Sequence, residues 1–280
     1  MREGRRIKSV DPFTSIIPFI MVERSDSQNS ITESFDVSGA EKLISELRQQ
    51  GYDAIGILHI IIASYVRTVS QYPKINRFIR GQRLYARNGI AVNVTIKRKM
   101  NLEDNETTIK LHFNPADTLF DVYDKLNAAL KKAYEEDTDT DNAARVIGYI
   151  PRLLKKFTMW VLKTLDYFDL LPSSLIEASP FHGSLFITNM ASLNIPPVRH
   201  HLYNFGNIPV FIAFGAKRHV QRFDRDGNLE RYKVVDFIAN LDDRICEGFY
   251  YAQCLKSLKK CMENPSCLTV PPESVVEDVR

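Results

Sequence analysis

The order of apolar and polar residues predicts groups of helices and strands along the first half of the chain. Residues 55–71 are apolar on nearly every side, which is typical of a buried helix, and Pro73 ends it. In residues 89–97 and 107–113 apolar and polar positions alternate, with the period of a half-exposed strand. A further helix is predicted next, with an apolar side made of Leu119, Val122, Leu126 and Leu130.

The second half of the chain predicts more strands and one closing helix. Strands are expected at residues 184–190, 210–214, 220–223 and 232–238, and Asp224 to Asn228 has the composition of a hairpin turn. The closing helix is expected from about Ile245 to Met262. Because helices and strands come in groups and not in regular strand–helix–strand units, the pattern predicts an α+β fold with a mixed β-sheet.

The two ends of the chain are predicted to lie outside this fold. Residues 1–30 form an N-terminal arm in this interpretation, since Pro12 and Pro18 interrupt any helix there. Residues 31–265 would form one domain with a helical insertion at about residues 137–180, and residues 266–280 a loose C-terminal tail.

Composition and charge narrow the classes of partner. The 37 Lys and Arg residues nearly balance 34 Asp and Glu, so charge alone does not favour a nucleic-acid-binding protein. The four cysteines all lie at or after Cys246 and match no zinc-binding spacing. No apolar run resembles a signal peptide or reaches the roughly 20 residues of a membrane-spanning helix. We therefore expect a cytoplasmic protein with free thiols and no bound metal.

The densest group of chemically active side chains lies where the last strand gives way to the closing helix. Asp242, Asp243, Arg244, Glu247 and Gly248 fall within seven residues. Charge packed this tightly at an element boundary forms either a structural ion-pair cluster or a functional site. The residue types alone leave both alternatives open.

Four segments, in a consistent order, carry a resemblance to a known family. Residues 72–76 (YPKIN) resemble F-P-x-x-N, and residues 89–94 (GIAVNV) resemble the strand I-G-V-A-V. Residues 186–190 (FITNM) resemble the strand T-I-S-N-L, and residues 242–248 (DDRICEG) resemble D-H-R-x-x-D-G. These are motifs of the catalytic domain of dihydrolipoyl acyltransferases from 2-oxo-acid dehydrogenase complexes, which share a fold with chloramphenicol acetyltransferase. The resemblance implies a two-layer α+β sandwich and a homotrimer with active sites between subunits.

The resemblance also implies roles for the residues of the last motif. In the family its histidine is the general base that takes the proton from the thiol of coenzyme A or of a dihydrolipoyl group. The position of this histidine is Asp243 here, the family's aspartate is Glu247, and the glycine is kept as Gly248. Acyl-CoA is the implied co-substrate.

Other residues are candidates for the remaining parts of such a site. Thr188 aligns with a hydroxyl residue of the family's T-I-S-N strand. In the family a hydroxyl in this region donates a hydrogen bond to the oxyanion, so Thr188 is the implied donor, and Ser184 and Asn189 are near alternatives. If another histidine replaces the missing base, the candidates are His182, His200 and His201.

The exchange of histidine for aspartate weakens the expected chemistry. An ordinary aspartate has a pKa near ~3.9, far below the ~8.5 of a thiol, so it is a poor base for that proton. The sequence therefore predicts a coenzyme A-dependent acyltransferase-like protein with impaired or lost catalysis. The alternative is a non-catalytic trimeric scaffold that binds an acyl thioester, a membrane surface or a protein partner.

The insertion at about residues 137–180 departs from the family. Within it, residues 151–165 predict a basic, aromatic, amphipathic helix that contains Trp160, the only tryptophan. Such a helix either lies on a membrane surface, docks a partner, covers the acyl channel as a lid, or packs on the core with its lysines in solvent.

Overall fold

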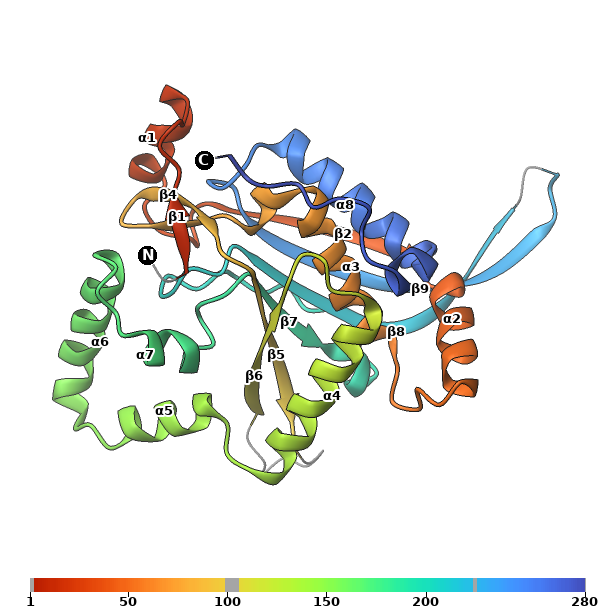
Figure 1. Ribbon diagram of the computed structural model, residues 1–280, viewed down its shortest axis with the longest axis horizontal. Helices are drawn as coiled ribbons and strands as arrows, with labels where there is room; N and C mark the ends of the chain where they lie inside the picture. Colours follow the sequence, from red (N-terminus) through yellow and green to blue (C-terminus); the bar gives the residue numbers. More distant parts are fainter. Residues whose placement is uncertain (1–2, 99–105, 224–225, 280) are drawn as a thin grey trace.

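A mixed six-stranded sheet forms the centre of the computed structural model, which describes residues 3–98, 106–223 and 226–279 (Figure 1). Its strands, in spatial order, are β2 (Gln28–Asp36), β9 (Leu229–Asp242), β8 (Val210–Phe223), β7 (Leu185–Asn189), β5 (Ile90–Lys97) and β6 (Glu106–Phe113). Strand β7 runs parallel to both of its neighbours, and the other pairs are antiparallel. The predicted α+β class with a mixed sheet is confirmed.

Four helices pack against one face of this sheet and give the molecule its two layers. They are α2 (Ser38–Gln49), α3 (Ile57–Gln71), α4 (Leu119–Glu135) and α8 (Gly248–Glu263). In α3 the consecutive residues Ile60, Ile61 and Ile62 are all fully buried, as its unbroken apolar sequence predicts. Each such side chain contributes about 1.5–3 kcal/mol of burial free energy, so α3 anchors the helical layer.

The opposite face of the sheet carries a smaller apolar cluster. Phe186 of β7 and Phe211 of β8 pack there against Leu202 and Ile208, which belong to the long connection between the 3-10 helix η2 (Met190–Leu193) and β8. Since side chains alternate along a strand, Thr188 shares this face with Phe186.

The N-terminal arm contains a helix that the sequence did not predict. Residues 12–20 form α1 (Pro12–Ile20). Pro12 occupies the first turn, where the missing N–H is tolerated, and the Asp11 side chain caps the helix by accepting a hydrogen bond from the Thr14 amide at 3.0 Å. The expectation that both prolines exclude a helix was wrong because this cap and the position of Pro12 favour one.

A small antiparallel sheet joins the arm to the domain. It consists of β1 (Gly4–Arg6), β4 (Arg83–Arg87) and β3 (Phe78–Arg80), which follows the 3-10 helix η1 (Pro73–Asn76). Glu3 precedes β1 and forms ion pairs with Arg80 and Arg87, the latter at 3.0 Å. Burial raises the pKa of Glu3, but the charges of Arg87 and Arg80 outweigh burial and lower that pKa to about 2.

Three helices fall within residues 137–180, where the sequence predicted helices. They are α5 (Asp139–Gly148), α6 (Arg152–Tyr167) and α7 (Ser173–Ala178), and they lie along the left and lower left of Figure 1. Within the described residues, no helix is both long and apolar enough to cross a membrane.

The hairpin near the C-terminus is longer than predicted. The two strands expected at residues 210–214 and 220–223 are one strand, β8, with an irregularity between Phe214 and Lys217. The predicted turn at residues 224–228 lies partly outside the described residues. After α8 the chain forms the 3-10 helix η3 (Pro265–Thr269).

Candidate functional site

The charged stretch after β9 separates into two parts, and its first part is a buried ion-pair cluster. The Arg244 guanidinium forms two hydrogen bonds with the Asp242 carboxylate, both 2.8 Å long. Arg24 lies 3.4 Å from the same carboxylate, and the Ser27 hydroxyl donates a hydrogen bond to it at 3.1 Å. All four residues are buried, so this cluster is a structural connection between the arm and the end of the sheet.

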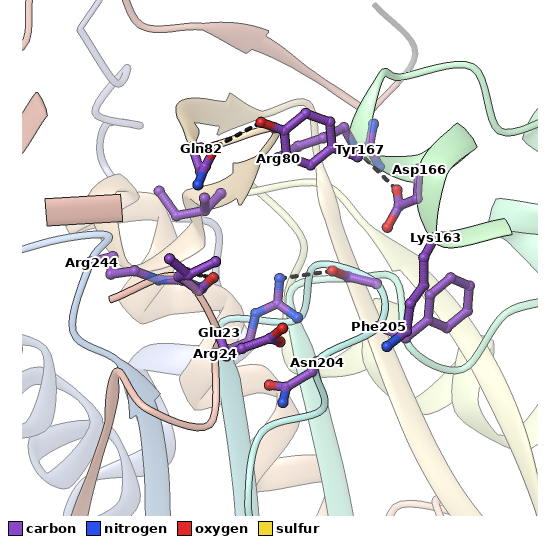
Figure 2. A pocket seen from close by; sticks show the side chains of 14 residues that line it. Glu23, Arg24, Arg80, Gln82, Lys163, Asp166, Tyr167, Asn204, Phe205 and Arg244 are labelled. Carbon is purple, nitrogen blue, oxygen red and sulfur yellow. Dashed lines mark hydrogen bonds and ion pairs between the residues drawn. The ribbon is translucent and has the colours of Figure 1, made fainter. Parts of the chain in front are cut away.

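The two arginines of this cluster also hold the neighbouring backbone. Arg24 donates hydrogen bonds to the carbonyl oxygens of Tyr203 and Gly206, at 2.6 and 2.7 Å. Arg244 donates to the carbonyl oxygens of Met21 and Val22, both at 3.0 Å. Figure 2 shows the small pocket beside the cluster, of about 200 Å³, with Lys163 and Asp166 of α6 across from Arg244.

The second part of the stretch lines a larger cleft of about 520 Å³, called here the motif cleft. Asp243, Glu247 and Gly248 line it from the end of β9 and the start of α8. The structure therefore brings together the three residues that the last motif singled out. The other walls come from α1, from η1 and its neighbour Arg77, and from Val279 of the tail.

Asp243 presents a carboxylate that has no partner in the part of the chain that the structure describes. Its backbone amide donates a hydrogen bond to the Ser27 carbonyl at 2.8 Å, which fixes the main chain. Among the described residues, its half-buried side chain forms no hydrogen bond and no ion pair. Asp243 is thus held in place by its backbone while its carboxylate remains available to a ligand in the motif cleft.

Glu247 and Gly248 form the start of α8. The Glu247 carboxylate lies 3.5 Å from the Lys74 ammonium. A hydrogen bond from its own backbone amide and the charge of Lys74 hold the pKa of Glu247 below its usual range. A Cβ atom at Gly248 would meet nothing within 4 Å, so the protein itself does not require a glycine there.

Two cations of the motif cleft were not among the predicted site residues. Lys74 belongs to η1, and Arg77 follows it; both line the cleft. Arg77 forms an ion pair with Asp278, with nitrogen–oxygen distances of 2.7 and 2.5 Å. The only sequence signal was the YPKIN motif, which contains Lys74 and ends beside Arg77.

The C-terminal tail is bound to the domain, in contrast to the loose tail that the sequence predicted. The Val276 amide donates a hydrogen bond to the Ser70 carbonyl at 2.8 Å, and the Gln71 side chain donates one to the Ser274 carbonyl at 2.7 Å. These contacts lead the tail along α3 to Arg77 and the motif cleft. The prediction missed them because their partners are some 200 residues away in sequence.

Cys246 also lines the motif cleft, but its thiol is buried. Burial raises the pKa of Cys246, and the nearby Cys254 and Glu247 raise it further. The thiol is therefore protonated at neutral pH and is not a nucleophile. Within the described residues, no group of three His, Cys, Asp or Glu side chains is placed to hold a metal ion.

The predicted oxyanion donor does not lie near Asp243 within one chain. Thr188 pairs with Ala213 of β8, which pairs with Ile238 of β9. Asp243 comes five residues after Ile238, roughly 16 Å along the strand direction and two strands across. Thr188 is buried on the face that carries the Phe186 cluster and does not line the motif cleft.

The alternatives to Thr188 have structural partners. The Ser184 hydroxyl accepts a hydrogen bond from the Ala91 amide at 3.0 Å, and it is fully buried. The Asn189 side chain caps η2 by accepting a hydrogen bond from the Ser192 amide at 3.2 Å. These hydrogen bonds give Ser184 and Asn189 a structural role in the fold.

The candidate histidines also lie outside the motif cleft. His182 is fully buried, with Nδ1 2.8 Å from the Ser179 hydroxyl and Nε2 3.3 Å from Asp166 Oδ1, the latter without hydrogen-bond alignment. His200 stacks on Phe211 at a centroid distance of 4.5 Å, and burial lowers its pKa. His201 is exposed in the same loop. The described lining of the motif cleft therefore contains Asp243 and no histidine.

The overall fold is shared with solved acyltransferase structures. A probable dihydrolipoamide acetyltransferase from Listeria monocytogenes 4b F2365 matches with a TM-score of 0.59 and 11% identity, over 93% of this chain and 95% of that one. A truncated catalytic core of the 2-oxoacid dehydrogenase multienzyme complex from Thermoplasma acidophilum matches with a TM-score of 0.55 and 13% identity, over 94% and 100%.

A chloramphenicol acetyltransferase matches with a TM-score of 0.56 and 12% identity, over 92% of this chain and 99% of that one. No family model matches the sequence, and no curated protein matches it. These similarities concern the fold, because the sequence identities are too low to carry an activity. The chain has the two-layer fold that chloramphenicol acetyltransferase shares with the catalytic cores of dihydrolipoyl acyltransferases, as the four motifs implied.

Proposed function

We propose that the motif cleft binds an acyl thioester of coenzyme A and that transfer of the acyl group is impaired or lost. The observation that carries this proposal is the Asp243 carboxylate, which lines the cleft at the position of the family's histidine and has no partner among the described residues. An ordinary aspartate is a much weaker base than imidazole, with reference pKa values of ~3.9 and ~6.5.

The lining of the motif cleft suits such a ligand. Its volume of about 520 Å³ falls in the range of small-molecule sites. Lys74 and Arg77 line the cleft in ion pairs with Glu247 and Asp278, which phosphate groups would replace as partners. Phe13 and Ile17 of α1 supply an apolar wall for an acyl or pantetheine chain. The N-terminus of α8, at Gly248, adds a favourable field for a developing negative charge.

The proposed transfer requires a second subunit. In an acyl transfer, a base removes the acceptor's proton, the acceptor attacks the acyl carbonyl, and the resulting oxyanion needs a hydrogen-bond donor. The intermediate then collapses, the carbon–sulfur bond breaks, and the base returns the proton to the departing coenzyme A thiolate. Thr188 lies too far from Asp243 in one chain, so a donor would come from a neighbour in a homotrimer. The exposed side chains of Phe13, Phe19 and Ile20 on α1 are apolar surface that such a neighbour would cover.

Calorimetry with coenzyme A and a transfer assay test this proposal together. We expect measurable binding, but little release of free coenzyme A from acetyl-CoA with thiol, amine or hydroxyl acceptors. Asp243→His is expected to raise the release by about 100-fold or more, since a positioned general base contributes about 10²–10⁴. Asp243→Asn and the control Glu46→Gln, on the exposed side of α2, should leave it unchanged.

Two results would contradict the proposal. Absence of coenzyme A binding would show that the motif cleft is not a thioester site. Rapid turnover that disappears in Asp243→Asn would show that Asp243 is an effective base and that catalysis is intact. Binding without transfer in any variant, including Asp243→His, would leave the scaffold function in place of an impaired enzyme.

A further inference from the structure

A stripe of exposed apolar residues follows the chain from the end of α5 along α6. It consists of Val146, Tyr149, Leu153, Phe157 and Trp160, whose side chains are 68, 81, 91, 61 and 61% exposed. The spacing of three or four residues places Leu153, Phe157 and Trp160 on one side of α6, while Val146 and Tyr149 lie at the end of α5. The rings of Phe157 and Trp160 stack at 5.8 Å. A helix that only packed on the core would turn this side inward, so the stripe faces outward for another reason.

The charged residues interleaved with the stripe, up to residue 165, are all positive, whereas the preceding stretch 135–141 is acidic and Asp137 forms an ion pair with Arg145 at 2.5 Å. Residues 142–165 contain five basic residues and no acidic one, in a chain whose 37 basic and 34 acidic residues are otherwise nearly balanced. Arg152 and Lys156, one helical turn apart, are exposed along the flank of the stripe. The next acidic residue, Asp166, faces inward and lies 3.2 Å from Arg80. The surface therefore matches a partner that is negatively charged outside and apolar beneath.

The shape of the surface favours a lipid bilayer over a protein groove. Helix α6 lies at the margin of the molecule, away from the central sheet (Figure 1). Leu153 is 91% exposed, so none of the residues that the structure describes covers it. An amphipathic helix with leucines and aromatic residues on one side and basic residues beside them is the usual form of an in-plane membrane helix. Arginine and lysine stems extend past such residues to reach anionic headgroups.

We propose that α5 and α6 form a docking surface for an anionic phospholipid bilayer, with α6 lying in the plane of the interface. The end of α6 is fixed to the protein body, so this contact would orient the whole molecule. Asp166 lies against Arg80, and the Tyr167 hydroxyl is 2.6 Å from the Gln82 side chain (Figure 2). Asp166 also lies 3.3 Å from His182. This proposal is independent of coenzyme A binding.

Trp160 provides a direct measurement because it is the only tryptophan of the chain. The full chain is mixed with vesicles of phosphatidylcholine and phosphatidylglycerol at a ratio of about 7:3, or of phosphatidylcholine alone, at low and high salt. We expect flotation with the anionic vesicles, a blue shift of tryptophan emission, and quenching by brominated acyl chains. Salt and neutral vesicles should weaken all three signals.

Two matched pairs of variants test the two components of the surface. Arg152→Gln with Lys156→Gln should weaken binding about 30-fold, since each basic residue near an anionic surface contributes about 1 kcal/mol. Lys256→Gln with Lys259→Gln removes the same charge from the exposed side of α8 and should have no such effect. Leu153→Gln with Phe157→Gln should abolish flotation, whereas Phe223→Gln, at an exposed phenylalanine of β8, should not.

Other results would overturn the proposal. One is an emission spectrum that does not change with anionic vesicles. Another is equal loss of binding in the paired control variants. A third is an emission already blue-shifted without lipid, together with a trimer that the Leu153→Gln and Phe157→Gln variant converts to monomers. That result would make the stripe a subunit interface. Circular dichroism of each variant establishes that it is folded.

Discussion

Asp242 and Asp243 are adjacent residues of the same type, yet their carboxylates meet different surroundings. Asp242 points into the buried cluster with Arg24 and Arg244, whereas Asp243 lines the motif cleft. Neighbouring side chains at a strand end point to opposite sides, which accounts for the division. The sequence left a structural cluster and a functional site as alternatives for this stretch, and the structure contains both, one residue apart.

The two aspartates should therefore respond differently to the same substitution. Asp242→Asn leaves two buried guanidinium groups without their carboxylate and is expected to lower the free energy of unfolding by about 3–5 kcal/mol. Asp243→Asn removes no internal contact and should change it by less than about 0.5 kcal/mol. Urea denaturation measures both, and equal effects would contradict the assignment of the two carboxylates.

A substitution at Gly248 tests whether this glycine is needed for the fold or for a ligand. Gly248→Ala is expected to keep or raise stability by up to about 1 kcal/mol, because alanine restricts the unfolded chain and its Cβ would meet no neighbour. If a coenzyme A ligand lies against the start of α8, the same methyl group lowers its affinity. Thermal melting and calorimetry measure these quantities, and a destabilised variant would show that the glycine serves the fold.

Cys267 is predicted to be the reactive thiol of the chain. It is the exposed cysteine, its sulfur lies 3.9 Å from that of Cys261, and the hydrogen bond between the two sulfurs, aided by the charge of Arg67, lowers the pKa of Cys267 to about 6. Because the thiolate is the nucleophile, alkylation by iodoacetamide at pH 7 should occur first at Cys267 and slow as the pH falls below about 6. Peptide mass spectrometry identifies the site, and first labelling of buried Cys246 would contradict the prediction.

At the scale of elements, the sequence pattern predicts the helices and strands that depend on residues close together in the chain. The alternation of β5 and β6 and the apolar run of α3 correspond to the observed elements. Helix α1 was missed because two prolines outweighed a cap at Asp11 that needs only Thr14. The bound tail could not be predicted, since Arg77 and Asp278 meet only after the whole domain has formed.

The same distinction applies to the candidate site. Asp243, Glu247 and Gly248 were found because they are contiguous in sequence and keep the spacing of a motif. Lys74 and Arg77 join them only through the packing of η1 beside α8, which no local pattern records. Thr188 lies within a recognisable motif, but within one chain it is distant from Asp243. A sequence motif contains no information on which subunit completes a site.

The ion pairs of Glu3 with Arg80 and Arg87 make the stability of the small three-stranded sheet dependent on pH. At about 2, the folded pKa of Glu3 lies below the ordinary value of 4.5, so its contribution to stability is present above about pH 4.5 and is lost as the pH falls toward 2. Relative to Glu3→Gln, the native protein should be about 3 kcal/mol more stable at neutral pH. Denaturant titrations of both proteins between pH 7 and 3 measure this difference, and a difference that stays constant with pH would contradict it.

At the scale of the whole molecule, the motif cleft is open to completion by a second copy. A homotrimer of the 32.2 kDa chain would have a mass of about 97 kDa, three times the chain mass, which light scattering measures directly. Phe19→Glu, on the exposed apolar side of α1, should shift the mass toward the monomer, whereas Phe223→Glu should not. A monomeric native protein would contradict the proposed site between subunits.

Both ends of the described chain reach the motif cleft. Phe13 lines it from the arm, Val279 lines it from the tail, and the Arg5 side chain donates hydrogen bonds to the carbonyl oxygens of Asp278 and Val279. An affinity tag fused after Arg280 would begin two residues after Val279, which lines the cleft. A polyhistidine tag there would bring imidazole groups close to Asp243, which stands at the position of the family's histidine. Binding and transfer should therefore be measured after the tag has been cleaved.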